Sequence, residues 1–377
     1  MVNYINGAIR ESIEKGKALM SKIPGARDLG IHFAALANKA NSEINDLNDE
    51  LDFLYSDPAY NDPKNLRSKF LTFRSLTGKL SKIENVVIAA ISRKSEDDEF
   101  VNKLVYQICN EINYPLPSPA ASCLSQKYYH IYPEYNLICI PLLEAEFLLH
   151  IPDIYHELGH PLIMIQNNPK TEKFRNNLGY FNLEVKKYFD EEIKRREMNA
   201  TSNAEIETLY AWKNNWLQVW SMELFCDLFA TITLGPAYLW SNLHMCTKLA
   251  WDVYKVPSQK GAHPPGEARM KVAIFGLELI GFQDEANTIK GKWEEFKKII
   301  DQKKSSDFSI ALPESLLKRA AEFCLTGTQQ IGCQIAKKET SDKVNLLLND
   351  AWAEFWKQPE TFFSWEQNAL KQFKESL

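Results

Sequence analysis

Apolar residues recur at helical spacing through most of the first 115 residues. Between 33 and 54 they alternate steps of four and three, an a/d seam over three heptads, made of Phe33, Ala37, Ala40, Ile44, Leu47, Leu51 and Leu54. The segment 56–63 holds two Pro and three Asp or Asn, which ends that helix. A second apolar series then runs from Leu66 to Ile91. We expect two antiparallel helices joined by a short loop, followed by a helix from about Asp97 to Asn113.

The pattern changes after the linker Pro115–Pro119. Tyr128–Tyr132 and Asn136–Pro141 are short β-branched or aromatic runs separated by Pro-Glu, which predicts a hairpin-like pair of strands. From Leu142 the spacing is helical almost to the C-terminus. The predicted fold is mainly α with a small antiparallel sheet. Three regions are expected: an N-terminal helical hairpin or bundle over 1–115, a core over 116–280, and a C-terminal helical region over 281–377 that packs on the core.

Composition narrows the class of protein. The 377 residues are 45% hydrophobic and 25% charged, as in ordinary globular chains. With 44 basic and 49 acidic residues the net charge is −5, which argues against a nucleic-acid partner. No signal peptide and no run near the ~18 apolar residues of a membrane span is visible, so we expect a cytoplasmic protein without a span. The seven cysteines are odd in number and lack paired spacing, which favours buried free thiols over disulfides or a cysteine-ligated zinc.

The segment His156-Glu-Leu-Gly-His160 carries the first candidate chemistry. Residues four apart on a helix project from one face, so both imidazoles can reach one zinc ion. Glu157 would then lie beside the zinc-bound water and take its proton. Asp153, directly after Pro152, marks a helix start. Because this motif arises by chance in roughly one such chain in a hundred, the rest of the site has to support it.

Two acids lie farther along in an apolar helical stretch. Glu223 and Asp227 are four apart and share a face, among Leu224, Phe225, Leu228 and Phe229. Two buried carboxylates without partners would be costly. Zinc bound by Glu223, with Asp227 accepting the Nδ1–H of a ligand histidine, would remove that cost. The alternative is that both acids pair with surface Lys or Arg.

A third element is His263, in the segment Gly261-Ala-His-Pro-Pro-Gly-Glu-Ala-Arg269. A histidine in a rigid Pro-Pro turn ahead of a helix can aim an N–H at a substrate oxyanion, with Arg269 one and a half turns on. Taken alone, His263 would be a loop or capping residue.

HExxH followed by ExxxD resembles the gluzincin class of zinc metallopeptidases, which includes thermolysin-like and prenyl-protein (CAAX) endopeptidases. HPPxxxR at 263–269 and the segment Leu234–Tyr238 are similar to stretches in the CAAX-type branch and in its soluble helical relatives. The similarity covers about residues 128–275. It implies a zincin-like core in which His156, His160 and Glu223 bind zinc and Glu157 is the general base. Asp227 is then the partner of a ligand histidine, and the catalytic residues His263 and Arg269 stabilise the transition state.

The resemblance has a departure and an addition. CAAX endopeptidases are membrane proteins, whereas no span is visible here, so their substrate class does not carry over. Gluzincin-like proteins also place an edge strand before the active-site helix, where an extended substrate pairs as an extra strand. The run here at that position is Asn136, Leu137, Ile138, Cys139 and Ile140. The alternative is an interior strand with no ligand role.

The expected function is that of a zinc-dependent metallopeptidase acting on a peptide or protein substrate. A zinc hydrolase of a non-peptide amide or ester would use the same site chemistry. The third hypothesis is a non-catalytic helical scaffold with structural zinc. The presence of Glu157 is evidence against it, because a structural site needs no base. The N-terminal helices either dock on the catalytic core or form a separate arm for a partner protein or self-association.

Overall fold

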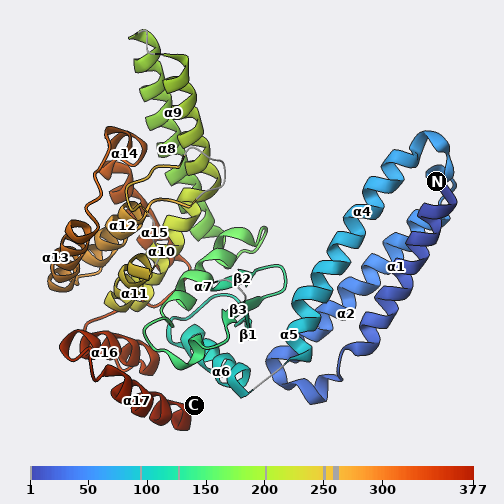
Figure 1. Ribbon diagram of the computed structural model, residues 1–377, viewed down its shortest axis with the longest axis horizontal. Helices are drawn as coiled ribbons and strands as arrows, with labels where there is room; N and C mark the ends of the chain where they lie inside the picture. Colours follow the sequence, from blue (N-terminus) through green and yellow to red (C-terminus); the bar gives the residue numbers. More distant parts are fainter. Residues whose placement is uncertain (1, 94–95, 126–127, 200–201, 249–251, 258–262) are drawn as a thin grey trace. The chain divides into compact units, whose positions relative to one another are not determined.

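The computed structural model describes residues 2–93, 96–125, 128–199, 202–248, 252–257 and 263–377. It is 75% helical with a small three-stranded sheet, which confirms the mainly α prediction (Figure 1). The chain forms two compact units. The first comprises Met1–Asn102, Pro119–Tyr128 and Glu134–Leu142, and the second comprises Lys103–Ser118, Tyr129–Pro133 and Leu143–Leu377.

Three long helices pack side by side in the first unit (Figure 1). They are α1 (Val2–Lys22), α2 (Ala26–Ser56) and α4 (Leu66–Lys82), which continues through the π-helical η2 (Ile83–Ile88) into α5 (Ala89–Ser92). The predicted seam is buried on α2, with none of its seven residues more than 5% exposed. The chain turns where predicted, through the short α3 (Pro58–Asn61) and η1 (Pro63–Asn65). Because α1 joins the predicted pair, the unit is a bundle.

The predicted apolar series on α4 is buried only from Leu76 onward. Phe70 is 46% exposed, although its spacing places it in the series. The buried residue at this end of α4 is Lys69, whose Nζ donates to Asn6 Oδ1 at 2.6 Å and Asn61 Oδ1 at 2.9 Å. The end of the bundle near the turn is therefore held by polar contacts.

The sheet is mixed, which corrects the antiparallel prediction. Its strands β1 (Ala120–Ser125), β2 (His130–Tyr132) and β3 (Leu137–Pro141) are ordered β1-β3-β2, and β1 pairs with β3 in parallel. The two later strands were predicted, whereas β1 was not. It follows α6 (Glu96–Glu111). Asn102 Oδ1 accepts the N–H of Ala121 at 2.9 Å, and Asp98 Oδ1 accepts that of Cys123 at 2.6 Å.

The strand order also shows that the predicted substrate-binding edge strand is wrong. The run from Asn136 to Ile140 enters β3, which lies in the middle of the sheet. Asn136 itself precedes the strand with φ 51°, and its carbonyl accepts the N–H of Ala120 at 2.9 Å. The unpredicted strand β1 occupies the side of β3 that an extended substrate would have used. β2 is the outer strand next to it.

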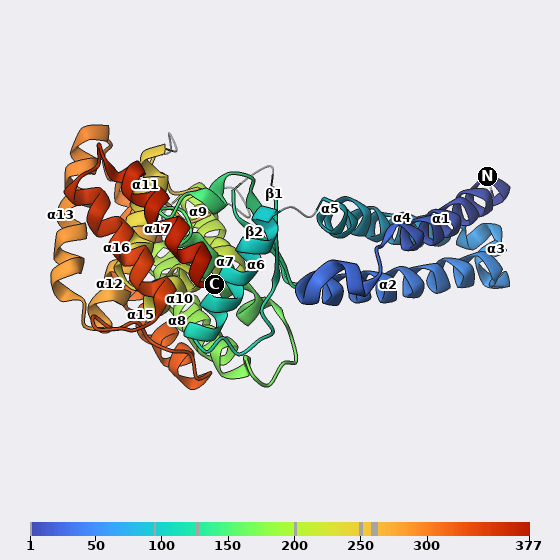
Figure 2. The same cartoon turned by 90° about the horizontal axis from the view of Figure 1, so that it is seen from below.

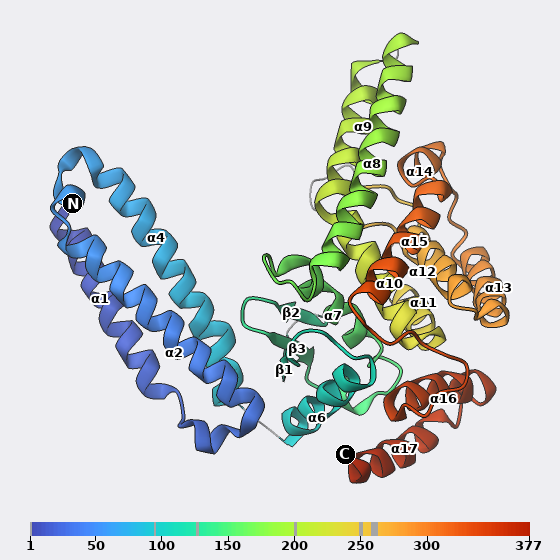
Figure 3. The same ribbon diagram turned by 180° about the vertical axis from the view of Figure 1, so that it is seen from behind.

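The centre of the second unit is α10 (Ser221–Leu234), of which every residue except Met222 is buried. Figure 3 shows it among the helices that pack on it, α7 (Asp153–Met164), α8 (Glu172–Met198), α12 (Gly266–Leu279) and α15 (Glu314–Gln330). Among the described residues, one helix is long and apolar enough to cross a membrane: the continuous run Asn203–Leu234 that includes α10. Since 78% of its most apolar window is buried, it also fits the core helix of a globular unit.

That run begins as α9 (Asn203–Asn215), capped by the Ser202 side chain, and passes through the π-helical η4 (Trp216–Trp220) into α10. The remaining helical segments of the second unit are η3 (Glu144–Glu146), α11 (Pro236–Lys248), α13 (Gln283–Ile300), α14 (Ser306–Ala311), α16 (Lys343–Lys357) and α17 (Phe362–Ser376). Figure 2 shows α16 and α17 together. Residues 281–377 thus belong to the same unit as the helices that carry the motifs.

Candidate metal centre

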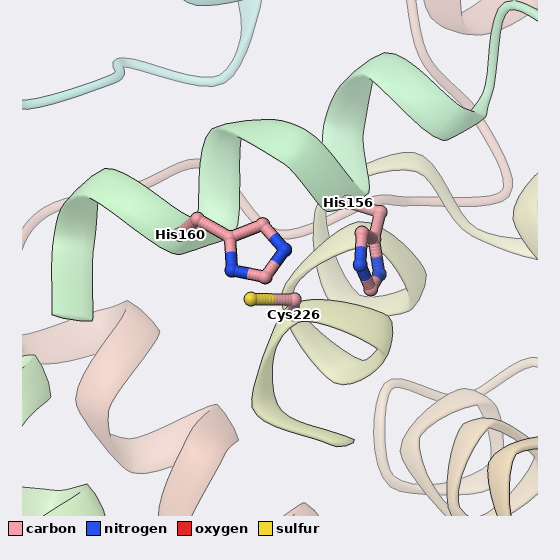
Figure 4. A group of neighbouring side chains, drawn as sticks. All are labelled: His156, His160 and Cys226. Atoms are coloured by element: carbon pink, nitrogen blue, oxygen red, sulfur yellow. The ribbon is translucent and has the colours of Figure 1, made fainter. Parts of the chain in front are cut away.

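The HELGH segment lies on α7, a short helix that is buried along most of its length. It begins directly after Pro152 with Asp153 in its first turn, as predicted. His156 and His160 project from one face, with ring centroids 5.1 Å apart (Figure 4). His156 is only 8% exposed. The local sequence therefore produces the pair of imidazoles that the spacing predicts.

Helices α7 and α10 approach each other at a glycine. A Cβ added to Gly159 would lie 2.9 Å from the Cα of Cys226 and 3.0 Å from its Sγ. Backbone atoms cannot move away cheaply, so only glycine permits this separation. Because Gly159 lies between the two histidines in sequence, the close approach brings the acids of α10 up to the imidazoles.

Glu223 is buried beside His156. Its Oε2 lies 3.5 Å from His156 Nε2 and 3.3 Å from Nδ1 of His263, and the residue is 5% exposed. Burial opposes ionisation, but hydrogen bonds from the two histidines hold the pKa of Glu223 well below its usual range. Glu223 is therefore held as a carboxylate next to His156 and His263.

Asp227 is fully buried and accepts from three side chains. Nδ1 of His156 donates to its Oδ1 at 2.9 Å, which is the contact predicted for a partner of a ligand histidine. Arg269 donates to it twice, from Nε at 2.8 Å and from Nη2 at 2.6 Å, and the hydroxyl of Tyr238 also donates. Burial alone would raise the pKa of Asp227, but the Arg269 guanidinium holds it below its usual range.

These contacts change the reading of Arg269. The sequence placed it next to His263 as a group facing the substrate, whereas its guanidinium lies against Asp227 with the side chain 12% exposed. A fork-shaped cation holding a buried carboxylate in two hydrogen bonds fixes the carboxylate's orientation. Arg269 therefore acts on His156 through Asp227. Tyr238 shares that role, which the sequence reasoning missed; its segment had drawn attention only through the family resemblance.

His263 lies at the open side of the cluster. Gly261 and Ala262, the preceding residues of its predicted motif, fall outside the described residues. As predicted, the two prolines lead directly into a helix, since α12 begins at Gly266. The side chain of His263 touches Glu223 and is still 62% exposed, so a bound molecule can reach it.

The protonation of the α7 residues follows from burial and their neighbours. Burial raises the pKa of Glu157 to about 7, although a backbone N–H from Ile131 of β2 stabilises the carboxylate. Burial lowers the pKa of His160 to about 4, which keeps it in the neutral form that binds metals. For His156, burial opposes protonation, but hydrogen bonds to Asp227 and Glu223 raise the pKa to about 10. A proton on His156 thus occupies the place where a metal cation would interact with the same carboxylates.

Cys226 is a second residue of this site that the sequence alone did not single out. Its Sγ and one ring nitrogen each of His156 and His160 lie within 4.8 Å of one another, and the described residues hold this one such group of metal-binding side chains. Figure 4 shows the sulfur directed toward the ring of His160. Its spacing from Glu223 could have indicated it, because residues three apart on a helix share a face.

In comparisons with known proteins, no family model, no curated protein and no solved structure matches this chain. The gluzincin resemblance therefore rests on the motif residues alone. What they can do chemically follows from their geometry.

Proposed function

We propose that this protein is a zinc-dependent metallopeptidase with a zincin-like core. The observation that carries the proposal is the burial of His156 and Glu157 on α7 against Glu223 on α10, with the half-buried His160 one turn on from His156. Burying so many ionisable groups in an apolar unit costs several kcal/mol per charge unless a counter-charge compensates. Two imidazoles and a carboxylate are the donor set of many catalytic zinc sites, so the residues fit this metal.

In this proposal His156, His160 and Glu223 hold the zinc. Bound there, zinc would supply Lewis-acid chemistry for the scissile carbonyl and for the attacking water. Glu157, which directly follows His156 and is buried beside it, would accept the water's proton and return it to the leaving amine. His263 is exposed beside Glu223 and can donate an N–H to the oxyanion.

Asp227 supports this arrangement by fixing His156. Accepting the Nδ1–H leaves Nε2 of the same ring for the metal. Arg269 and Tyr238 in turn hold Asp227 in place. Hydrolysis of a non-peptide amide or ester would use the same groups, so the substrate class has to be tested directly.

The test is zinc analysis and incubation with a mixed peptide library, with the wild type beside Glu157→Gln. We expect one zinc per chain in both proteins, and a loss of cleavage of about 10³-fold or more in the variant, since an amide cannot accept the water's proton. Asp153→Asn is the matched control, because it removes another buried carboxylate of α7 that accepts from Ser241 at 3.3 Å. Retained cleavage in Glu157→Gln would reject the mechanism, and zinc-loaded protein that cleaves no peptide, either as wild type or as Cys226→Ala, would reject the peptidase.

A further inference from the structure

We infer that Cys226 is a ligand of the metal in the resting protein, where its sulfur holds the coordination position that a water molecule must take for hydrolysis. The inference rests on the proposed function, because it assigns the fourth position of the same site. It makes the centre self-blocked: four protein ligands close it, and the thiolate has to leave before substrate is hydrolysed.

The first support is the convergence of three donor atoms. The Sγ of Cys226 lies within 4.8 Å of a ring nitrogen of His156 and of one of His160. Nitrogen and sulfur ligands of one tetrahedral zinc are separated by roughly 3.3–3.6 Å, given bond lengths near 2.0–2.3 Å. Small side-chain rotations therefore suffice to bring all three atoms to a single ion.

The second support is the packing around the sulfur. Gly159 has no Cβ, and a Cβ there would come within 3.0 Å of the Sγ. The space that the sulfur occupies thus depends on a glycine placed between the two ligand histidines. Cys226 is 0% exposed, so its sulfur lies on the floor of the site and is directed at His160 (Figure 4).

The chemistry of the thiol agrees with this role. Zinc binding would form a metal–sulfur bond and break the S–H bond, releasing the proton to solvent. Thiolate and imidazole are both preferred zinc ligands. Two imidazoles and the sulfur give three ligands, and Glu223, whose Oε2 lies 3.5 Å from His156 Nε2, would supply the fourth.

X-ray absorption on the zinc-loaded full chain tests the assignment, with Cys226→Ala beside the wild type. Cys324→Ala is the matched control, since Cys324 is equally buried against α10 and donates its S–H to the Phe225 carbonyl at 3.5 Å. We expect one sulfur at about 2.3 Å from zinc in the wild type and in Cys324→Ala, and none in Cys226→Ala. The sulfur-to-cobalt charge-transfer band of the cobalt-substituted proteins should follow the same pattern. Zinc affinity should fall about 10–100-fold in Cys226→Ala, while peptide turnover per bound zinc rises.

A wild-type shell of nitrogen and oxygen only would overturn the inference, and so would a sulfur that persists in Cys226→Ala. Turnover per bound zinc that falls in Cys226→Ala would overturn the blocking role. Should Cys226→Ala fail to fold, Cys226→Ser keeps the volume and is read through the same sulfur signal. Zinc–sulfur ligation without cleavage in any variant would reject the peptidase but support Cys226 as a ligand. Cleavage by a protein whose zinc has only nitrogen and oxygen ligands would support the peptidase but reject Cys226 as a ligand.

Discussion

The seam of α2 in the first unit and the α7–α10 interface in the second are both buried helix faces, but they contain different kinds of residue. Every seam position of α2 is apolar. The α7–α10 interface buries His156, Glu157, Glu223 and Asp227. Burial of apolar side chains stabilises a helix pair by itself, whereas burial of ionisable groups opposes folding unless each is paired. The α2 seam is thus explained by apolar burial alone, whereas the α7–α10 interface requires that its ionisable groups pair with one another and with Arg269 and His263.

The largest expected effect lies at the polar interface. Asp227→Ala leaves Arg269 and His156 without their buried counter-charge, so we expect a loss of about 3–5 kcal/mol in unfolding free energy. Urea unfolding measures it. The double variant Asp227→Ala/Arg269→Ala should lose less unfolding free energy than the sum of the losses in the two single variants. It removes the buried guanidinium together with its counter-charge. Strict additivity would show that the pair is not coupled.

The apolar seam gives the next effect. Ile44→Ala removes a fully buried side chain of α2 and should cost about 2–5 kcal/mol. Phe53→Ala on the same helix is the control, because Phe53 is 60% exposed and should change stability by no more than about 0.5 kcal/mol. Zinc stoichiometry should be unchanged in both. A change in bound zinc with Ile44→Ala would contradict the view that the α2 seam contributes to stability alone.

Gly159→Ala sharpens the comparison at the point where the two site helices touch. Its Cβ would meet the backbone of Cys226 at 2.9 Å, so we expect about 1–3 kcal/mol of destabilisation together with weaker zinc binding. The same change at Gly179 of α8 is the control, because nothing lies within 4 Å of a Cβ there. That helix should gain about 0.5–1 kcal/mol instead. Equal outcomes at the two glycines would count against the close approach.

His263→Ala should have the smallest effect on stability, within about 0.5 kcal/mol, because the side chain is 62% exposed. Turnover should nevertheless fall about 10²–10³-fold, the effect of losing one oxyanion donor. Differential scanning calorimetry and peptide cleavage measure the two quantities on the same sample. Loss of zinc in this variant would make His263 a ligand, and the proposed role would be wrong.

The sequence predicts well the features that depend on the periodicity of a single helix. The α2 seam and the His156–His160 pair follow from helical periodicity, which acts over a few residues. The strand β1 escaped prediction because AASCLS holds few β-branched or aromatic residues. Its extended state depends on pairing with β3 and on hydrogen bonds that its backbone N–H groups donate to Asp98 and Asn102, which are distant in sequence.

Residues of the site that act between helices were harder to assign. The spacing of Arg269 from His263 gave its distance along α12 but not which neighbour its guanidinium would meet, and that neighbour is Asp227. Spacing along the chain does not distinguish Cys226 from the other six cysteines. Its closeness to the histidines arises from the contact of α7 with α10 at Gly159, which no local pattern encodes.

The continuous helix from Asn203 to Leu234 has a consequence for how this protein can evolve. Its π-helical segment at Trp216–Trp220 directly precedes Ser221, so it sets the rotation of everything that follows. One residue corresponds to about 100° of helix rotation. An insertion or deletion of a single residue there would turn Glu223 and Asp227 away from α7 while leaving each side chain intact. Selection for the site would therefore tolerate substitutions in this segment but would remove insertions and deletions.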